Sequence, residues 1–331
     1  IDWCNKNNIL HLDLKLDCYM PDGTAQKWGK DLGFPASISY CMNAVSRDEN
    51  AVLILDQLDA LRWTARKSNS SLATCLELIR EIRNINLERE NKISIIFVCR
   101  TYDLENDNGI KSLFEKESRN NTETWQRVEV NELMENEVEE ILGNKYHSYP
   151  KKLKQLLKTP SNLYIWEQIN NKEEYYQITS TYNLVDKWWR DLSEKCLDAN
   201  LIEDNLTNLK EKLVKLFLDT DETIFSKKRL IGNERALRYL ISQGMLTERS
   251  NKVSFVHQSF LDCFVAERMI LDYYTNSDVN DILGNKTQQN PTRRYQFQIF
   301  LQSLLEESEK DFLNFGTRLI KSDNVRFNFK Y

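Results

Sequence analysis

The fold of this 331-residue chain is decided by Leu53-Ile54-Leu55-Asp56-Gln57-Leu58-Asp59. The apolar run 52–55 is followed directly by acids, which is typical of a strand buried on both faces that ends at the edge of a parallel sheet. Because ligands bind at that edge of open parallel sheets, Asp56 and Asp59 are candidate functional residues. The alternative interpretation is a strand end capped by turn-forming aspartates.

Two further segments complete the predicted sheet. The stretch 9–16 carries leucine at every second position from Leu10 to Leu16, which indicates a strand with one buried face. The stretch 93–99 is a second continuous apolar strand. Because helical patterns separate these strands, we predict a parallel sheet with right-handed crossovers. The other elements predicted in this part are helices at 25–32, 37–45, 71–89 (with Ser71 as N-cap) and 110–116, and a short strand at 127–130.

The strand patterns stop after about residue 130. Helices are predicted at 131–142, 151–157, 162–170, 184–199 and 206–218. A helix at 233–243, ended by Gly244, then precedes strands at 245–248 and 253–256 and a long helix at 259–274. This order is the outline of a winged helix. From Ser277 onward the pattern is helical, with Asn290-Pro291 as a helix start.

Composition places the chain among soluble globular proteins. Hydrophobic residues make up 41% and charged residues 29%. The 9 glycines and 5 prolines are well below the roughly 23 and 17 that average usage would give, so we expect a mostly helical protein. The net charge of −5 excludes a generally basic nucleic-acid binder, although a local basic patch is compatible with it. No apolar run reaches the length of about 18 residues that a transmembrane helix needs, and no signal peptide is visible.

The cysteines and histidines do not form a recognisable metal or disulfide pattern. The 7 cysteines are scattered and never spaced as C-x-x-C, so we expect reduced thiols in a cytosolic protein. With 3 histidines, no zinc constellation stands out. The chain begins at Ile1 and ends without a helix-ending signal, and we therefore expect it to be the middle of a longer protein.

Two other segments carry candidate binding residues. Arg100 follows the predicted strand 93–99, where a guanidinium could grip two phosphate oxygens; the alternative is an ion pair with a carboxylate such as Asp103. His257 follows the apolar strand pattern 253–256. Its alternative interpretation is a structural histidine with satisfied hydrogen bonds.

In this order, the segments resemble the STAND class of P-loop NTPases, which includes NACHT proteins and many bacterial antiviral sensors. The stretch 53–61 resembles the Walker B strand, and 95–100 resembles the sensor-1 strand with its arginine. Lys158-Thr159-Pro160-Ser161-Asn162-Leu163 resembles the helical-domain motif whose proline packs on adenine. The stretch 255–266 resembles the winged-helix segment whose histidine approaches the β-phosphate of ADP.

The resemblance implies ATP or ADP with Mg²⁺ as cofactors and a role for each matching residue. It implies that Asp56 is the acid on the magnesium side, acting through water, Asp59 a second acid that orients or deprotonates water, Arg100 the sensor-1 arginine, Pro160 the adenine contact and His257 the phosphate contact.

One departure from the family pattern is large. The chain contains no G-x-x-x-x-G-K-[ST] sequence, whose backbone N–H groups cradle the phosphates. In the family this loop follows a strand at the centre of the sheet, so its absence implies a gap beside 93–99. A chain complete without the loop would bind nucleotide weakly or not at all.

The resemblance also implies an α/β part followed by an all-α part. The expected domains are an N-terminally incomplete P-loop-type sheet domain at 1–130, a small helical domain at 131–183, a winged-helix domain with its preceding helices at 184–276, and the start of a helical sensor or repeat region at 277–331.

The function implied is a cytoplasmic, nucleotide-dependent switch in antiviral defence. The parent protein would be a slow ATPase that forms homo-oligomers on activation, with an effector domain upstream and a C-terminal sensor for a protein or foreign ligand. Neither membrane nor nucleic acid is an expected partner. Two alternatives stay open: a non-catalytic winged-helix and helical interaction module, and a DNA-binding ATPase of the origin-recognition type, for which Lys227-Lys228-Arg229 would be the phosphate contact.

Overall fold

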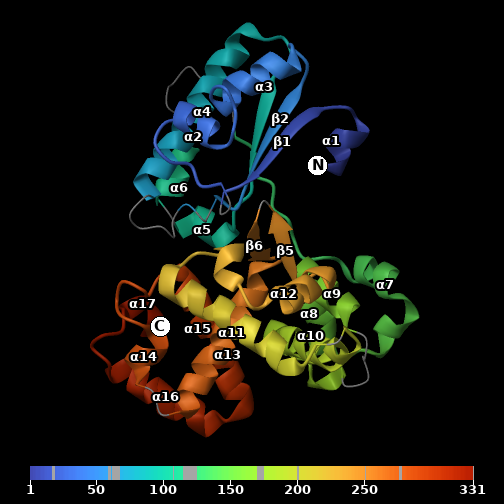
Figure 1. The fold of residues 1–331 in the computed structure, drawn as a ribbon, viewed down its shortest axis with the longest axis vertical. Coiled ribbons are helices and arrows are strands. Elements are labelled where there is room, and N and C mark those ends of the chain that lie inside the picture. The colour runs from blue at the N-terminus through green and yellow to red at the C-terminus, as the bar shows by residue number, and fades with distance from the viewer. Residues whose placement is uncertain are drawn as a thin grey trace. The chain divides into compact units, whose positions relative to one another are not determined.

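The structure is a computed structural model. It describes residues 1–16, 19–58, 61, 68–106, 108–114, 125–169, 175–199, 201–249, 251–275 and 278–330. By their internal contacts, residues 1–129 and 130–331 form two compact units, and each is described by itself. Helices predominate, as the scarcity of glycine and proline predicts, and the elements of both units are labelled in Figure 1. None of the described helices combines the length and the apolar character needed to cross a lipid bilayer.

The first unit contains a parallel sheet of three strands. Strands β1 (Leu10–Lys15), β2 (Ala51–Asp56) and β3 (Ile93–Phe97) lie in the order β1-β2-β3. The three predicted strands and their parallel direction are therefore confirmed. β2 pairs directly with β3, with Leu55 opposite Phe97, and none of the described strands lies on the other side of β3, which is the edge strand. The gap that the family resemblance implies beside 93–99 therefore stays an expectation.

Helices of the first unit pack against one face of this sheet, which Figure 1 shows beside the strands. Leu53 and Leu55 face this packed side and are fully buried, whereas Ile96 and Val98 on the opposite face are 47% and 46% exposed. The prediction that the apolar strands are buried on both faces is therefore wrong for the described residues. An apolar run alone cannot distinguish one covered face from two. The helices of this unit are α1 (Asp2–Lys6), α2 (Ala25–Asp31), α3 (Ile38–Ser46), α4 (Ser68–Glu88), α5 (Thr101–Asn106) and α6 (Asn108–Leu113).

Carboxylates on α4 hold the starts of the two helices before β2. Glu77 accepts a hydrogen bond from the backbone N–H of Ala25 at 2.8 Å, and Glu81 accepts one from the Ser37 hydroxyl at 2.7 Å. These contacts satisfy polar groups that helix starts leave unpaired. Ser71 is not the N-cap that we predicted, because α4 begins at Ser68 and the Ser71 hydroxyl donates to the Pro21 carbonyl at 2.7 Å.

The predicted strand at 127–130 is also wrong. These residues have no regular secondary structure, and the side chains of Val128 and Val130 are 83% and 92% exposed. A short run of alternating valines favours a strand by propensity, but a strand needs a neighbour to accept its backbone hydrogen bonds, and none of the described strands pairs with it.

The second unit is helical around one small antiparallel sheet. Strands β4 (Ile224–Ser226), β5 (Leu246–Arg249) and β6 (Lys252–Phe255) lie in the order β4-β6-β5, and the pattern analysis missed β4, which has three residues. The helices are α7 (Glu135–Leu142), α8 (Lys151–Leu157), α9 (Pro160–Gln168), α10 (Thr181–Lys195), α11 (Glu203–Thr220), α12 (Glu234–Ser242), α13 (Gln258–Tyr274), α14 (Val279–Leu283), α15 (Pro291–Glu307), α16 (Glu309–Lys321) and α17 (Phe327–Lys330).

Several helix boundaries in this unit follow the predicted local signals. Pro291 is the first residue of α15, and the Asn290 side chain accepts the Arg293 N–H at 2.8 Å. Gly244 follows α12 with a φ of +74°, a left-handed conformation that glycine adopts without strain. Trp166, Trp188 and Trp189 are 0%, 1% and 7% exposed, so they are core residues and not base-stacking platforms.

Candidate functional site

The carboxyl edge of the parallel sheet holds Asp56 and the residues just after β3. Backbone pairing continues past the strands themselves: Val98 N–H donates to the Leu55 carbonyl and Leu58 N–H to the Val98 carbonyl, both at 2.9 Å. On the other side, Leu16 N–H donates to the Asp56 carbonyl at 2.9 Å. The backbone of Asp56 is thereby tied to a neighbouring segment at the sheet edge where ligands of parallel sheets bind.

The side chain of Asp56 is half-buried, and one of its oxygens accepts a hydrogen bond within the turn that follows β2. Its Oδ1 accepts the N–H of Gln57 at 2.9 Å, and Gln57 has a left-handed φ of +61°. One of the two carboxylate oxygens of Asp56 therefore stabilises the turn, as the alternative interpretation predicts. A left-handed residue other than glycine costs about 1–3 kcal/mol and persists where the surroundings hold it, which is common at ligand sites.

Lys15 and Arg100 lie on the same uncovered face of the sheet as Asp56. Lys15 is directly opposite Asp56 in the β1–β2 register. Exposure alternates along the chain from Ile96 through Val98 to Arg100, which places Arg100 on this face, just beyond Val98. Among the described residues, this edge therefore presents the Asp56 carboxylate with Lys15 and Arg100 on the same face. Sequence reasoning missed Lys15, although its alternation with Leu14 and Leu16 could have revealed it.

Two of the sequence-based alternatives at this edge stay open. Arg100 is exposed and directly precedes α5, and its carbonyl accepts the Leu104 N–H at 3.0 Å. The side chain of Asp103, its alternative partner, lies outside the described residues, and so does Asp59.

A second cluster of predicted residues forms within the second unit. His257 directly precedes α13, and its ring centroid lies 5.4 Å from that of Tyr164 on α9 and 5.7 Å from that of Phe260. Tyr164 is one helical turn after Pro160, which is the exposed first residue of α9. The structure therefore brings the predicted adenine contact and the predicted phosphate contact onto adjoining elements.

The loop before α9 is held from inside the protein. Asn162 is 4% exposed; its amide donates to the Leu156 carbonyl at 3.1 Å, and its Oδ1 accepts the Thr181 hydroxyl at 3.1 Å. A buried amide with both ends satisfied holds the backbone of the 158–163 motif in one conformation. Pro160 is thus presented to solvent on a fixed helix start.

Gly244 connects this cluster to the turn after α12 and provides a test of its packing. We expect Gly244→Ala to destabilise the fold by about 1–2 kcal/mol, because a left-handed φ disfavours residues with a Cβ. In addition, that Cβ would lie 2.9 Å from the Tyr164 hydroxyl oxygen. The free energy of unfolding, measured by urea denaturation, checks this.

The matched control is Gly316→Ala, where an added Cβ meets no atom within 4 Å in the middle of α16. This change should be neutral or stabilise by up to about 1 kcal/mol, because alanine favours helix. Adding Tyr164→Phe to Gly244→Ala should recover the contact part of the loss; equal losses for Gly244→Ala with and without the Tyr164 hydroxyl would contradict the proposed contact.

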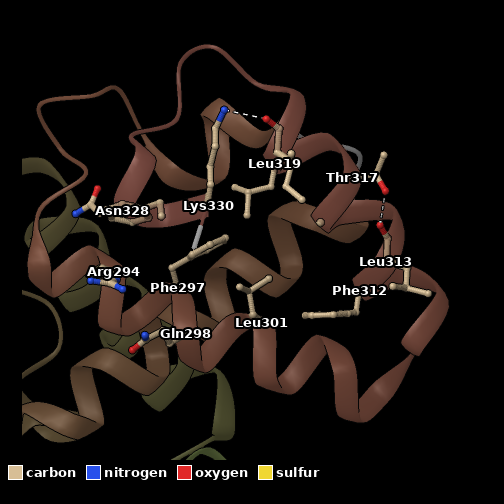
Figure 2. A pocket seen from close by; sticks show the side chains of 13 residues that line it. Arg294, Phe297, Gln298, Leu301, Phe312, Leu313, Thr317, Leu319, Asn328 and Lys330 are labelled. Atoms are coloured by element: carbon tan, nitrogen blue, oxygen red, sulfur yellow. Dashed lines mark hydrogen bonds between the residues drawn. The ribbon is translucent and has the colours of Figure 1, made fainter.

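A pocket of about 400 Å³ lies within the second unit, between α15, α16 and α17. Figure 2 shows the side chains of Phe297, Leu301 and Phe312 along it. Two of its polar side chains bind backbone: Lys330 Nζ donates to the Ile320 carbonyl at 2.8 Å, and the Thr317 hydroxyl to the Leu313 carbonyl at 2.9 Å. The pocket is therefore largely apolar, with Arg294, Gln298 and Asn328 as its other polar lining residues.

The described thiols and metal-binding side chains suggest no further catalytic centre. Cys18 lies outside the described residues, and the other cysteines are free thiols. Burial raises the pKa of Cys75 to about 12 and also raises the pKa of Cys263, so both stay protonated and weakly nucleophilic at neutral pH. Within the described part of the chain, no three His, Cys, Asp or Glu side chains are grouped to hold a metal ion.

Comparison with known protein families and with curated proteins finds no match for this chain.

Proposed function

We propose that this chain is the nucleotide-binding switch core of a STAND-class NTPase. The observation that carries the proposal is the contact between His257 and Tyr164, because it joins the element with Pro160 to the element with the predicted phosphate contact. The order α11, β4, α12, β5, β6, α13, with the antiparallel order β4-β6-β5, supports reading this region as a winged helix.

The sheet edge suits the phosphate and magnesium side of such a site. A carboxylate is the hard oxygen ligand that Mg²⁺ prefers, and Asp56 keeps a second oxygen beyond the one that takes the Gln57 N–H. Lys15 and Arg100 supply positive charge for phosphate oxygens on the same face. Bound Mg²⁺ would neutralise phosphate charge, while these residues orient the phosphates.

The second cluster suits the lid of the switch. Pro160 offers an exposed apolar ring to a base, and His257 offers an imidazole to a phosphate. By the family resemblance, a nucleotide held by this cluster would favour a closed state. Exchange of ADP for ATP shifts the balance between states only through a difference in affinity for the two states.

A second candidate is an interaction module without nucleotide. One observation favours it: the sequence has no phosphate-binding loop. The DNA-binding alternative has less support, because Lys227 pairs with Glu248 at 2.7 Å and Arg229 with Glu222 at 3.3 Å. Both pairs reduce the positive charge that DNA would meet.

The proposed function is tested by ADP binding to the full-length protein encoded by the gene. We expect His257→Ala to weaken the affinity for ADP by about tenfold or more, since a hydrogen bond to a charged group contributes about 1.5–3 kcal/mol. The matched control is His147→Ala, which removes an exposed histidine paired with Glu139 at 2.7 Å and should leave ADP affinity unchanged. Isothermal titration calorimetry measures both.

Two results would decide against the switch. Equal ADP affinity for the wild type and both histidine variants would remove His257 from the site. Absence of ADP and ATP binding by the wild-type full-length protein would favour the interaction module.

A further inference from the structure

A second pocket, of about 240 Å³, lies in the 130–331 unit where α11, α13, α14 and α15 meet. It is smaller than the roughly 300–1,000 Å³ typical of sites for drug-sized ligands, so its occupant would be a small molecule. The residues that line it are Leu218, Asp219, Val265, Arg268, Met269, Asp272, Asp281, Ile282, Gly284, Gln288 and Arg293.

Arg293 is the unusual member of this pocket. The residue is 8% exposed, and its guanidinium makes no hydrogen bond or ion pair with any residue that the structure describes. Burial lowers the pKa of Arg293, and the charge of Asp221 opposes that shift without forming an ion pair. A buried cation without hydrogen-bond partners is costly, so a polar ligand in the pocket would relieve a cost that the fold carries.

The other charges of the pocket restrict what this ligand can be. Arg268 is already paired with Asp272 at 2.9 Å. Asp281 accepts the Asp278 N–H with one oxygen, and Asp219 is exposed at the end of α11. Three carboxylates against two guanidinium groups would repel a polyanion such as a nucleotide triphosphate. They would attract a positive group near a single negative one.

We propose that this pocket binds a small zwitterion, a free amino acid, with its carboxylate on Arg293 and its ammonium facing Asp219 and Asp281. A guanidinium accepts a carboxylate through two parallel hydrogen bonds, which supplies the partners that Arg293 lacks. The two acids at the rim supply the acceptors that an ammonium needs. This site is independent of the proposed nucleotide site, so either can fail without the other.

Thermal unfolding of the purified chain with small probes tests the site. Each of the twenty L-amino acids is added at millimolar concentration, with sodium acetate and methylammonium chloride at equal ionic strength as single-charge probes. We expect at least one amino acid to raise the unfolding midpoint with a saturating dose response, and acetate or methylammonium to do so at least tenfold more weakly.

Variants then locate the binding. Arg293→Gln should lower the affinity for the amino acid that stabilises the wild type at least tenfold. Arg294→Gln, at the neighbouring position that lines the other pocket, should leave this affinity unchanged. Without ligand, Arg293→Gln should be no less stable than the wild type, because it removes a largely buried charge that forms no ion pair with the described residues. Asp219→Asn, at an exposed position, should weaken the amino acid severalfold and leave the weak acetate response unchanged.

The proposal is overturned if no amino acid shifts the midpoint, or if acetate matches the best amino acid. It is also overturned if Arg293→Gln responds like the wild type. Should Arg293→Gln fail to fold, Asp219→Asn decides alone: an unchanged response to the amino acid overturns the proposal.

Discussion

Replacing Phe260 by alanine is expected to destabilise the 130–331 unit by about 3–5 kcal/mol, the usual range for truncating a fully buried phenylalanine. Phe260 is 0% exposed, and its ring packs edge-on against Trp188 with centroids 5.2 Å apart and against His257 at 5.7 Å. Alanine would leave a cavity that these neighbours, held on α10 and α13, can fill only in part. Guanidinium denaturation, followed by tryptophan fluorescence, measures the loss.

The matched control is Phe327→Ala, the same chemical change at a side chain that is 76% exposed. Surface substitutions usually change the free energy of unfolding by less than about 0.5 kcal/mol. Similar losses at the two positions would mean that the packing around α13 is not as described. Because Phe260 supports the ring of His257, the same variant should also weaken ADP binding by the full-length protein if the proposed switch is correct.

The second large effect is expected from Asp56→Asn. If the proposed switch is correct, magnesium-dependent ATP hydrolysis by the full-length protein should fall by about 100-fold, in line with the loss caused by removing outer-shell carboxylates of metal sites. Asparagine keeps an oxygen that can accept the Gln57 N–H, so the turn after β2 should survive. Steady-state phosphate release at several Mg²⁺ concentrations measures the change, and circular dichroism checks the fold.

Asp13→Asn is the matched control for this variant. Asp13 is exposed on β1 and occupies the same face of the sheet, opposite Ile54, two residues before Lys15. Its replacement should leave hydrolysis within about twofold of the wild type, since interactions between exposed charges contribute little free energy. A rate of hydrolysis in Asp56→Asn equal to that of the wild type would contradict the proposal that Asp56 is the acid of a Walker B strand.

The separate hydrophobic cores explain why the two variants should act independently on stability. Phe260 belongs to a core built from residues 138–329, whereas Leu53 and Leu55, next to Asp56, belong to a different core within residues 14–113. Mutations without shared partners usually add in free energy. The double variant Phe260→Ala with Asp56→Asn should therefore lose as much stability as the two single variants together.

Local patterns in the sequence determined most of the elements. Apolar runs and period-2 leucines predicted the three parallel strands within one or two residues, and the helix starts at Asn290-Pro291 and the helix end at Gly244 followed from backbone chemistry. The position of Asp56 and Arg100 at one sheet edge follows from parallel pairing, because equivalent strand ends must meet.

The tertiary structure decided what depends on neighbours. The alternation of apolar and polar residues in the sequence could not show that the described helices leave one face of the sheet exposed. It also could not show that β2 pairs directly with β3, or that none of the described strands pairs with the valines at 127–130. It also could not place Lys15 opposite Asp56, since register is a property of two strands and not of one.

The burial of Arg293 is a second feature that local sequence patterns could not predict. Near the start of α15 its sequence context indicates an ordinary solvated arginine, and only the packing of α11, α13 and α14 around it buries the charge. Backbone preferences act over a few neighbouring residues, so the sequence by itself determined where helices and strands begin and end. Burial and pairing arise from residues far apart in the chain, so the structure alone decided which side chains face one another.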